Sequence, residues 1–307
     1  MGGATVSVLA GGVLLWGGAW AVVRGGTAVA LRSGVRPWIV GLTVVAFGTS
    51  APEIVVTAVA ALNQSGDMAV GNAIGSNACN LGLVLGTVLV LGGRMGGGTG
   101  KHWDALRLLG SLGALGWVLR DGSVDRTDGL GLLALYLVAL IAELMKGGDS
   151  GREKPSGQRP IVGILHLVLG IACVAAGAKL LVDGAVGVAE RWSVDQGMIG
   201  LTVVALGTSL PELAVCLAAA RAGRDSDSAL GLGLGTLWGS NVLNALLVPG
   251  LAAVLAPMHV REETLVEPLA IVALLSVAGI IAASLGRGRL AGAGLLVMYA
   301  VFVFRAF

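Results

Sequence analysis

The hydrophobic and polar positions divide the chain into long apolar runs separated by short polar segments. About 20 mostly apolar residues are needed to cross the ~30 Å hydrocarbon layer of a bilayer as a helix. Helices also satisfy their own backbone hydrogen bonds there. We therefore predict an all-α membrane protein with ten transmembrane helices. The predicted spans are residues 6–23, 38–62, 68–91, 103–119, 127–145, 161–188, 194–220, 230–256, 265–284 and 290–304.

The two halves of the chain repeat each other. GLTVVAFGTSAPE at Gly41 to Glu53 returns as GLTVVALGTSLPE at Gly200 to Glu212, an offset of 159 residues. A polar linker, residues 146–160, separates a first repeat at residues 1–145 from a second at residues 161–307. Five spans in each half make the second half enter the membrane from the opposite side. The sequence thus predicts two inverted-topology five-helix repeats.

Composition agrees with the bilayer as solvent. Hydrophobic residues make up 55% of the chain and charged residues 12%, against about 25% charged in soluble domains. The 51 glycines lie largely inside the apolar runs, where small residues let helices approach closely. With the N-terminus outside, thirteen Lys and Arg lie in inner loops and five in outer ones. The positive-inside rule therefore predicts outer termini and a cytoplasmic linker in a multi-pass protein of the cell membrane.

Several function classes are excluded by what the chain lacks. The net charge of +2, without a basic arm, gives no reason to expect nucleic acid. There is no GxxxxGK[ST] loop, so any transport would use a gradient rather than ATP. The three cysteines are isolated and indicate neither disulfides nor zinc. No tightly bound cofactor is expected.

Each copy of the repeated motif places a carboxylate, Glu53 or Glu212, directly after a proline inside an apolar run. An ionisable side chain is costly at membrane depth and is a functional hypothesis by default. Because Pro52 has no amide hydrogen, we expect a helix break that frees backbone carbonyls near Ala46 and Thr49. The predicted polar groups of the two copies are Ala46, Thr49, Ser50 and Glu53, and Ala205, Thr208, Ser209 and Glu212.

A second polar cluster follows each copy, GNAIGSNACN at residues 71–80 and GLGTLWGSNVLN at residues 233–244. Ser76 and Asn80 are four residues apart, as are Ser240 and Asn244, so each pair shares one helix face. With the glutamates they form a set of oxygen ligands without sulfur or imidazole. Such a set suits Ca²⁺, which takes about six to eight oxygens, and it also suits Na⁺.

Structural roles compete with these interpretations. Ser and Thr hydroxyls often bond to the helix backbone or join helices, and we expect Asn77 and Asn241 to serve packing or to support the ligands rather than to bind the ion. Lys179 and Asp183 are expected to pair with each other, and Glu143, at the end of a span, is expected to reach water.

The doubled GTSxPE and GSNxxN motifs resemble the inverted repeats of the cation/Ca²⁺ exchanger superfamily, and most closely its Na⁺/Ca²⁺ exchanger branch. The resemblance implies a ten-helix antiporter that works by alternating access, with long, sliding first and sixth helices. It implies that Glu53 and Glu212 bind both Ca²⁺ and Na⁺, with Thr49 and Thr208 beside them. The remaining implied ligands are Ser50, Ser209, Ser76, Ser240, Asn80, Asn244 and the carbonyls of Ala46 and Ala205.

One departure from that branch concerns charge. Many of its members carry Asp where this chain has Asn244, and potassium-dependent relatives carry Asp at both asparagine positions. With Asn80 and Asn244 the site has two formal negative charges, which balance one Ca²⁺ or two Na⁺. This argues against potassium dependence. The short linker also leaves no room for a regulatory Ca²⁺-binding domain.

The sequence therefore predicts an antiporter that exchanges Ca²⁺ for Na⁺ across the membrane and functions as a monomer. The alternative is a Ca²⁺/H⁺ antiporter, because proton-coupled relatives also pair glutamate with asparagine. A membrane hydrolase that uses the glutamates as acid and base is disfavoured, since the two halves are too alike for two roles. A structural helix bundle would retain its properties when either glutamate is neutralised.

Overall fold

The computed structural model describes residues 2–91, 101–145, 160–191, 205–224, 226–285 and 288–306, and nearly all of them are helical. Within these ranges six helices are long and apolar enough to cross a membrane, and a bent pair, Pro37–Thr49 with Ala51–Leu62, makes up to seven. Two shorter apolar helices cover Ala105–Leu119 and Glu267–Ala282. The predicted span at residues 194–220 lies partly outside the described residues. A mostly helical fold with several helices able to cross a membrane is thus confirmed, and the count of ten stays a prediction.

The chain forms two compact units that take segments from both sequence halves. Unit 1 contains Met1–Ala51 and Asp149–Thr236, and unit 2 contains Pro52–Gly148 and Leu237–Phe307. The units therefore do not coincide with the two sequence repeats, because each unit combines segments of both halves.

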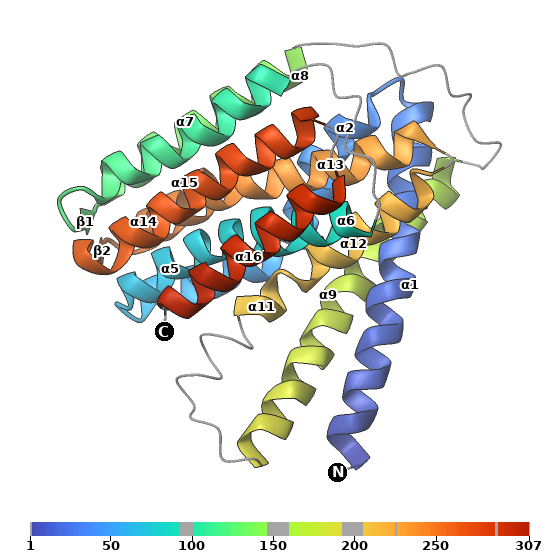
Figure 1. The fold of residues 1–307 in the computed structure, drawn as a ribbon, viewed down its shortest axis with the longest axis horizontal. Helices are drawn as coiled ribbons and strands as arrows, with labels where there is room; N and C mark the ends of the chain where they lie inside the picture. Colours follow the sequence, from blue (N-terminus) through green and yellow to red (C-terminus); the bar gives the residue numbers. More distant parts are fainter. Residues whose placement is uncertain are drawn as a thin grey trace. The chain divides into compact units, whose positions relative to one another are not determined.

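Unit 1 is built around two long helices, α1 and α9. Its elements are α1 (Gly2–Arg32), α2 (Pro37–Val40), η1 (Gly41–Val45), α3 (Ala46–Thr49), α9 (Pro160–Arg191), α11 (Ala205–Thr208), α12 (Leu210–Ala222) and the first part of α13 (Asp227–Val242). Helices α1 and α9 pack side by side, and α12 packs against both (Figure 1).

Glycines spaced by seven residues join α1 to α9. A Cβ added at Gly11, Gly18 or Gly25 of α1 would collide with the α9 backbone around Gly177, Gly170 and Gly163, respectively. At Gly18 the added atom would lie 2.8 Å from Val174 N and 2.9 Å from Gly170 O. The neighbouring Gly12 and Gly17 would meet nothing within 4 Å. The heptad glycines thus let the two backbones touch, as proposed for small residues in membrane helices.

Helix α1 is longer than its apolar run suggested, because it continues from the predicted end at Val23 to Arg32. The guanidinium of Arg24 lies 5.1 Å from the centre of the Trp20 ring, so this charge is accommodated on the helix surface. Gly25 and Gly26 then approach α9 and Leu232. Close packing therefore extends the helix past a charge that the hydropathy pattern treats as an end.

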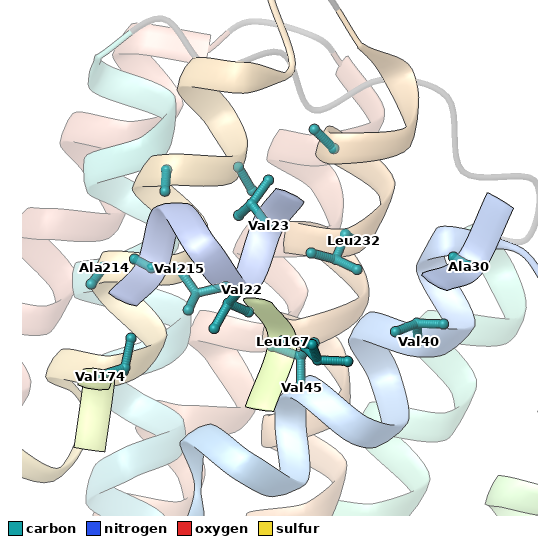
Figure 2. Close-up of a cluster of buried hydrophobic side chains, with 14 residues drawn as sticks. Val22, Val23, Ala30, Val40, Val45, Leu167, Val174, Ala214, Val215 and Leu232 are labelled. Carbon is teal, nitrogen blue, oxygen red and sulfur yellow. The ribbon is translucent and has the colours of Figure 1, made fainter. Parts of the chain in front are cut away.

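A buried core of small and branched side chains holds unit 1 together (Figure 2). Val22 and Val23 of α1 meet Leu167 and Val174 of α9 and Val215 of α12. Their side chains are at most 6% exposed. This core keeps the segment before the first helix break against α9 and α12.

Unit 2 contains the remaining helices and one short ladder. Its elements are most of α4 (Ala51–Leu62), then α5 (Gly66–Ala78), η2 (Cys79–Val84), α6 (Leu85–Val90), α7 (Lys101–Leu119), β1 (Ser123–Val124), α8 (Arg126–Met145), the last part of α13 (Asp227–Val242), η4 (Leu243–Leu247), α14 (Val248–Leu255), β2 (Met258–His259), α15 (Glu262–Leu285) and α16 (Gly288–Ala306). Helix α15 packs against α5, α7 and α16, and α14 packs against α8.

Polar contacts tie one end of unit 2 together. Strands β1 and β2 pair antiparallel, with Ser123 opposite His259 and Val124 opposite Met258. The backbone N–H and Nε of Arg261 each donate to the carboxylate of Asp67, both at 2.7 Å. These contacts link the start of α5 to the loops before α8 and α15.

The prediction that Glu143 reaches water is wrong. Glu143 is 3% exposed and accepts a hydrogen bond from the Arg107 guanidinium, with Arg107 on α7 and Glu143 on α8. Lys179 and Asp183 do pair as predicted, at 2.9 Å, but both are well exposed. The partner of Glu143 is thus a charged residue of α7, Arg107. The hydrophobic pattern of α8 alone could not show that α7 supplies it.

We expect Glu143→Gln to lower the free energy of unfolding by about 2 kcal/mol, because removing one charge of a buried pair leaves the other poorly compensated. The midpoint of thermal unfolding in detergent should fall. Asp183→Asn is the control, since an exposed pair contributes about 0–1 kcal/mol. Equal midpoints for the two variants would contradict a stabilising role for the buried pair.

Candidate functional site

Both GTSxPE motifs interrupt a helix at their serine. Helix α3 ends at Thr49, Ser50 has φ −85° and ψ 9°, and α4 begins at Ala51. In the second copy α11 ends at Thr208, Ser209 has φ −88° and ψ 1°, and α12 begins at Leu210. These angles lie in the sparsely populated bridge region, where many active-site residues are found. The predicted break is confirmed in both copies.

Inside unit 1 the two motif copies meet at Glu212. The Ser50 hydroxyl donates a hydrogen bond to Glu212 Oε1 at 2.8 Å, and neither side chain is exposed. A hydroxyl that donates to a carboxylate makes a strong, charge-assisted bond. Residues 162 positions apart are thus joined at a buried carboxylate.

Other hydroxyl side chains close to Ser50 and Glu212 in the sequence are also buried in unit 1. Thr49, Thr208 and Ser209 are 1%, 7% and 1% exposed, respectively. Ser209 Oγ has no hydrogen-bond partner among the described residues. Ala205 opens α11, and the structure describes its backbone but not its side chain.

The carbonyl oxygen of Ala46 is not freed by the break, contrary to the prediction. It accepts the Ser50 backbone N–H at 2.9 Å and the Thr49 hydroxyl at 3.3 Å. The reason is that the turn at Ser50 keeps the last helical hydrogen bond of α3, and a Thr hydroxyl readily bonds back to its own helix. The role of Ala46 as a ligand stays a prediction.

Unit 2 contains the other carboxylate, Glu53, which is fully buried in the first turn of α4. The neighbouring Ile54 packs against a small core formed by Ala73 of α5 and Leu243 of η4. Asn72 of α5 donates from Nδ2 to Thr57 Oγ1 at 2.9 Å and to the backbone oxygen of Glu53 at 3.4 Å. Helix α4 is therefore fastened to α5 at the residue that carries the carboxylate.

Asn80 and Asn244 occupy π-helical turns at equivalent positions of the two halves. Helix η2 begins at Cys79 and η4 at Leu243, and each candidate asparagine is its second residue. Such π-helical turns are rare and often mark functional sites. The sequence patterns did not reveal these turns. The spacing of apolar residues follows the average of 3.6 residues per turn of an α-helix, and one wider turn changes it too little to be seen.

The candidate residues of unit 2 offer buried oxygens. Ser240, Asn80 and Asn244 are 0% exposed and Ser76 is 2% exposed. Both amide atoms of Asn80 and of Asn244, and Ser76 Oγ, have no hydrogen-bond partner among the described residues. Leaving a buried polar group unsatisfied costs about 1–3 kcal/mol. The oxygens therefore fit cations or water as partners, and the amide nitrogens fit hydrogen-bond acceptors such as water.

The chemistry of the site is that of oxygen ligands. The described residues hold no group of three or more His, Cys, Asp or Glu that could bind a metal, so a zinc-type centre is not supported there. Carboxylates, amides and hydroxyls suit hard cations such as Ca²⁺. In unit 1 Ser50 meets Glu212, and unit 2 contains Glu53 and the buried Ser76, Ser240, Asn80 and Asn244.

Sequence reasoning missed Asn72 and Thr57. Asn72 is four residues before Ser76 and eight before Asn80 on the same helical run, so its position on the polar face was readable. Its contact with α4 was not, because the sequence does not show which helix covers that face.

Comparison with known proteins gives the relatives of this chain. Residues 3–145 and 162–307 match the family described as sodium/calcium exchanger protein. The chain is 34% identical to the inner membrane protein YrbG of Escherichia coli over 80% of its length and 77% of that protein. It is 30% identical to the sodium/calcium exchanger MaX1 of Methanosarcina acetivorans over 96% of both.

A solved structure of the sodium-calcium exchanger NCX_Mj, soaked with 2.5 mM Na⁺ and 0.1 mM Ca²⁺, matches with a TM-score of 0.85 and 30% identity. The match covers 98% of this chain and 97% of that one. The family match spans most of the chain, and the fold agrees along almost its whole length. This chain therefore belongs to the sodium/calcium exchanger protein family.

Proposed function

We propose that the chain exchanges Ca²⁺ for Na⁺ across a cell membrane by alternating access. Membership of the family makes it a cation/Ca²⁺ antiporter and a multi-pass membrane protein. Ca²⁺ and Na⁺ are its transported substrates. The observation that carries the proposal is the buried Glu212, to which the first motif copy donates a hydrogen bond through Ser50.

The proposed architecture is ten helices in two inverted five-helix repeats joined by residues 146–160. The two stretches matched by the family, residues 3–145 and 162–307, support this division. So do the serine breaks and the π-helical turns, which recur at corresponding places in both halves. We also propose that the protein functions as a monomer.

The proposed ligands are the residues expected from the motifs. Glu53 and Glu212 bind Ca²⁺ and Na⁺ in turn, and their two charges balance one Ca²⁺ or two Na⁺. The remaining ligands are Thr49, Ser50, Thr208, Ser209, Ser76, Ser240, Asn80, Asn244 and the backbone oxygens of Ala46 and Ala205. The buried amides of Asn80 and Asn244, without protein partners among the described residues, support their inclusion.

The coupling ion can be tested in vesicles that contain the purified protein. We expect Ca²⁺ uptake when Na⁺ is loaded inside and diluted outside. If three Na⁺ move per Ca²⁺, one net charge crosses, and 100 mV should shift the equilibrium Ca²⁺ ratio about 50-fold.

Protein-free vesicles and vesicles with equal Na⁺ on both sides are the controls. Uptake that does not depend on Na⁺ but is driven by an imposed pH gradient would contradict Na⁺ coupling and identify the protein as the alternative, a Ca²⁺/H⁺ antiporter. Uptake driven by Na⁺ but insensitive to potential would keep the exchange and indicate electroneutral coupling of two Na⁺ to one Ca²⁺.

A further inference from the structure

The two proposed ligand helices, α4 with Glu53 and α12 with Glu212, are held to the next helix in different ways. In the first half Thr57, one turn after Glu53, donates from Oγ1 to the backbone oxygen of Ala69 at 3.5 Å. In the second half Cys216, one turn after Glu212, donates from Sγ to the backbone oxygen of Gly233 at 3.5 Å. These contacts occupy equivalent positions. Thr57 and Cys216 are 159 residues apart, like Glu53 and Glu212, and Ala69 and Gly233 are 164 residues apart, like Asn80 and Asn244.

The first half has a second link through Asn72. Asn72 has two amide hydrogens, and its Nδ2 lies 2.9 Å from Thr57 Oγ1 and 3.4 Å from the backbone oxygen of Glu53. The equivalent residue of the second half is Thr236, which is fully buried and donates to Leu232 O of its own helix at 2.9 Å. A threonine hydroxyl that bonds back one turn does not join two helices.

We propose that Asn72 is a positioning residue for cation binding, which fixes the main chain of Glu53 against the helix that carries Ser76 and Asn80. The inference rests on the proposed function, in which Glu53 is a cation ligand. Asn72 itself is not a ligand in this proposal. It holds α4 in register with α5, so that a carboxylate and a hydroxyl from two helices keep their spacing.

The physical reason is the precision that binding requires. Ligands to Ca²⁺ lie within about 2.3–2.6 Å of the ion, so a small shift of α4 along α5 changes the distance from Glu53 to any ion held by α5. The backbone oxygen of Glu53 already belongs to the helix ladder of α4, and it has a second lone pair that Asn72 uses. The bond therefore holds the backbone without unwinding the helix.

The test compares Asn72→Ala with Asn72→Thr, which copies the second half. Both should raise the Ca²⁺ concentration for half-maximal Na⁺-driven uptake about fivefold, the effect of losing a hydrogen bond of ordinary strength. The maximal rate per folded molecule should change by less than about twofold, because the carboxylate itself remains. Direct binding of ⁴⁵Ca²⁺ to purified protein should weaken by the same factor.

A matched control and a double-mutant cycle separate positioning from general packing. Thr236→Val removes a hydroxyl that bonds only within its own helix, and it should leave Ca²⁺ affinity unchanged. Thr57→Val removes the acceptor of Asn72, so Asn72→Ala should weaken binding less in that background than in the wild type. Asn72→Asp keeps the shape of the side chain but lacks the amide hydrogens that reach Thr57 and Glu53. Its Ca²⁺ affinity should therefore stay below that of the wild type.

The outcomes distinguish this inference from the proposed function. If Glu53→Gln abolishes Ca²⁺ binding while Asn72→Ala keeps wild-type affinity, Asn72 has no positioning role and the exchanger proposal stands. If Glu53→Gln itself binds Ca²⁺ normally, both proposals fail. Independent effects of Asn72→Ala and Thr57→Val would likewise overturn the coupling through Thr57.

Discussion

Replacing Glu212 by glutamine is expected to reduce Na⁺-driven Ca²⁺ uptake at least about a hundredfold, because it removes one of the two formal charges proposed to hold the ion. Glu212 is fully buried in this structure, so its charge is screened little by bulk water. Initial rates of ⁴⁵Ca²⁺ uptake into vesicles, normalised to the amount of folded protein, measure the effect.

The fold of this variant should survive. The glutamine oxygen can still accept the hydrogen bond that Ser50 donates to Glu212, and a buried neutral amide costs less desolvation than a buried carboxylate. The elution volume and thermal midpoint in detergent should therefore stay close to those of the wild type. Asp183→Asn is the matched control, since Asp183 is an exposed carboxylate paired with Lys179. Normal uptake by Glu212→Gln would exclude Glu212 as a ligand.

Gly18→Leu should destabilise the protein by about 3 kcal/mol, because its side chain would be forced into the α1–α9 interface. A Cβ at Gly18 would lie 2.8 Å from Val174 N, 2.9 Å from Cys173 Cβ and 2.9 Å from Gly170 O. Two of these three contacts are to backbone, so the helices themselves would have to separate. The yield of monodisperse protein and its thermal midpoint should both fall.

The neighbouring glycine provides the control. A Cβ at Gly17 would meet nothing within 4 Å, and the position is exposed. Gly17→Leu should therefore fold as well as the wild type, with a small gain because Gly is a poor helix residue. Equal losses for Gly17→Leu and Gly18→Leu would mean that glycine content rather than close helix contact determines stability. An unchanged Gly18→Leu would contradict the packing of α1 on α9.

The sequence was sufficient for the features that depend on solvent and on local chemistry. Apolar run length predicted nine helical regions to within a few residues at most ends, because crossing a bilayer imposes a minimum length. Pro52 and Pro211 predicted the breaks, since proline removes a backbone donor wherever it lies. A proline also restricts the backbone of the residue before it, here Ala51 and Leu210. The breaks fall one residue earlier, at Ser50 and Ser209.

Features that depend on which helices meet were not predictable. The heptad spacing of Gly11, Gly18 and Gly25 is visible in the sequence, but its match to Gly177, Gly170 and Gly163 in α9 requires the pairing of α1 with α9. The same holds for Arg107 and Glu143, whose burial depends on the contact between α7 and α8.

For the candidate site, residue types were predictable and their hydrogen bonds were not. Buried Glu53, Glu212, Asn80 and Asn244 were identified from doubled motifs, and all four are fully buried. The use of the Ala46 carbonyl by Ser50 and Thr49 follows from the exact turn at the break. The π-helical turns at Asn80 and Asn244 depend on a single backbone register shift that leaves no periodic pattern.

Equilibrium binding of ⁴⁵Ca²⁺ to the purified wild type, Glu53→Gln and Glu212→Gln proteins tests most directly the claim that one ion is held by both carboxylates. If the ion needs both, each single variant should lose binding at least about a hundredfold and the double variant should lose little more, because coupled ligands are non-additive. Two single variants that each bind Ca²⁺ with wild-type affinity, or losses that simply add in the double variant, would contradict a shared site.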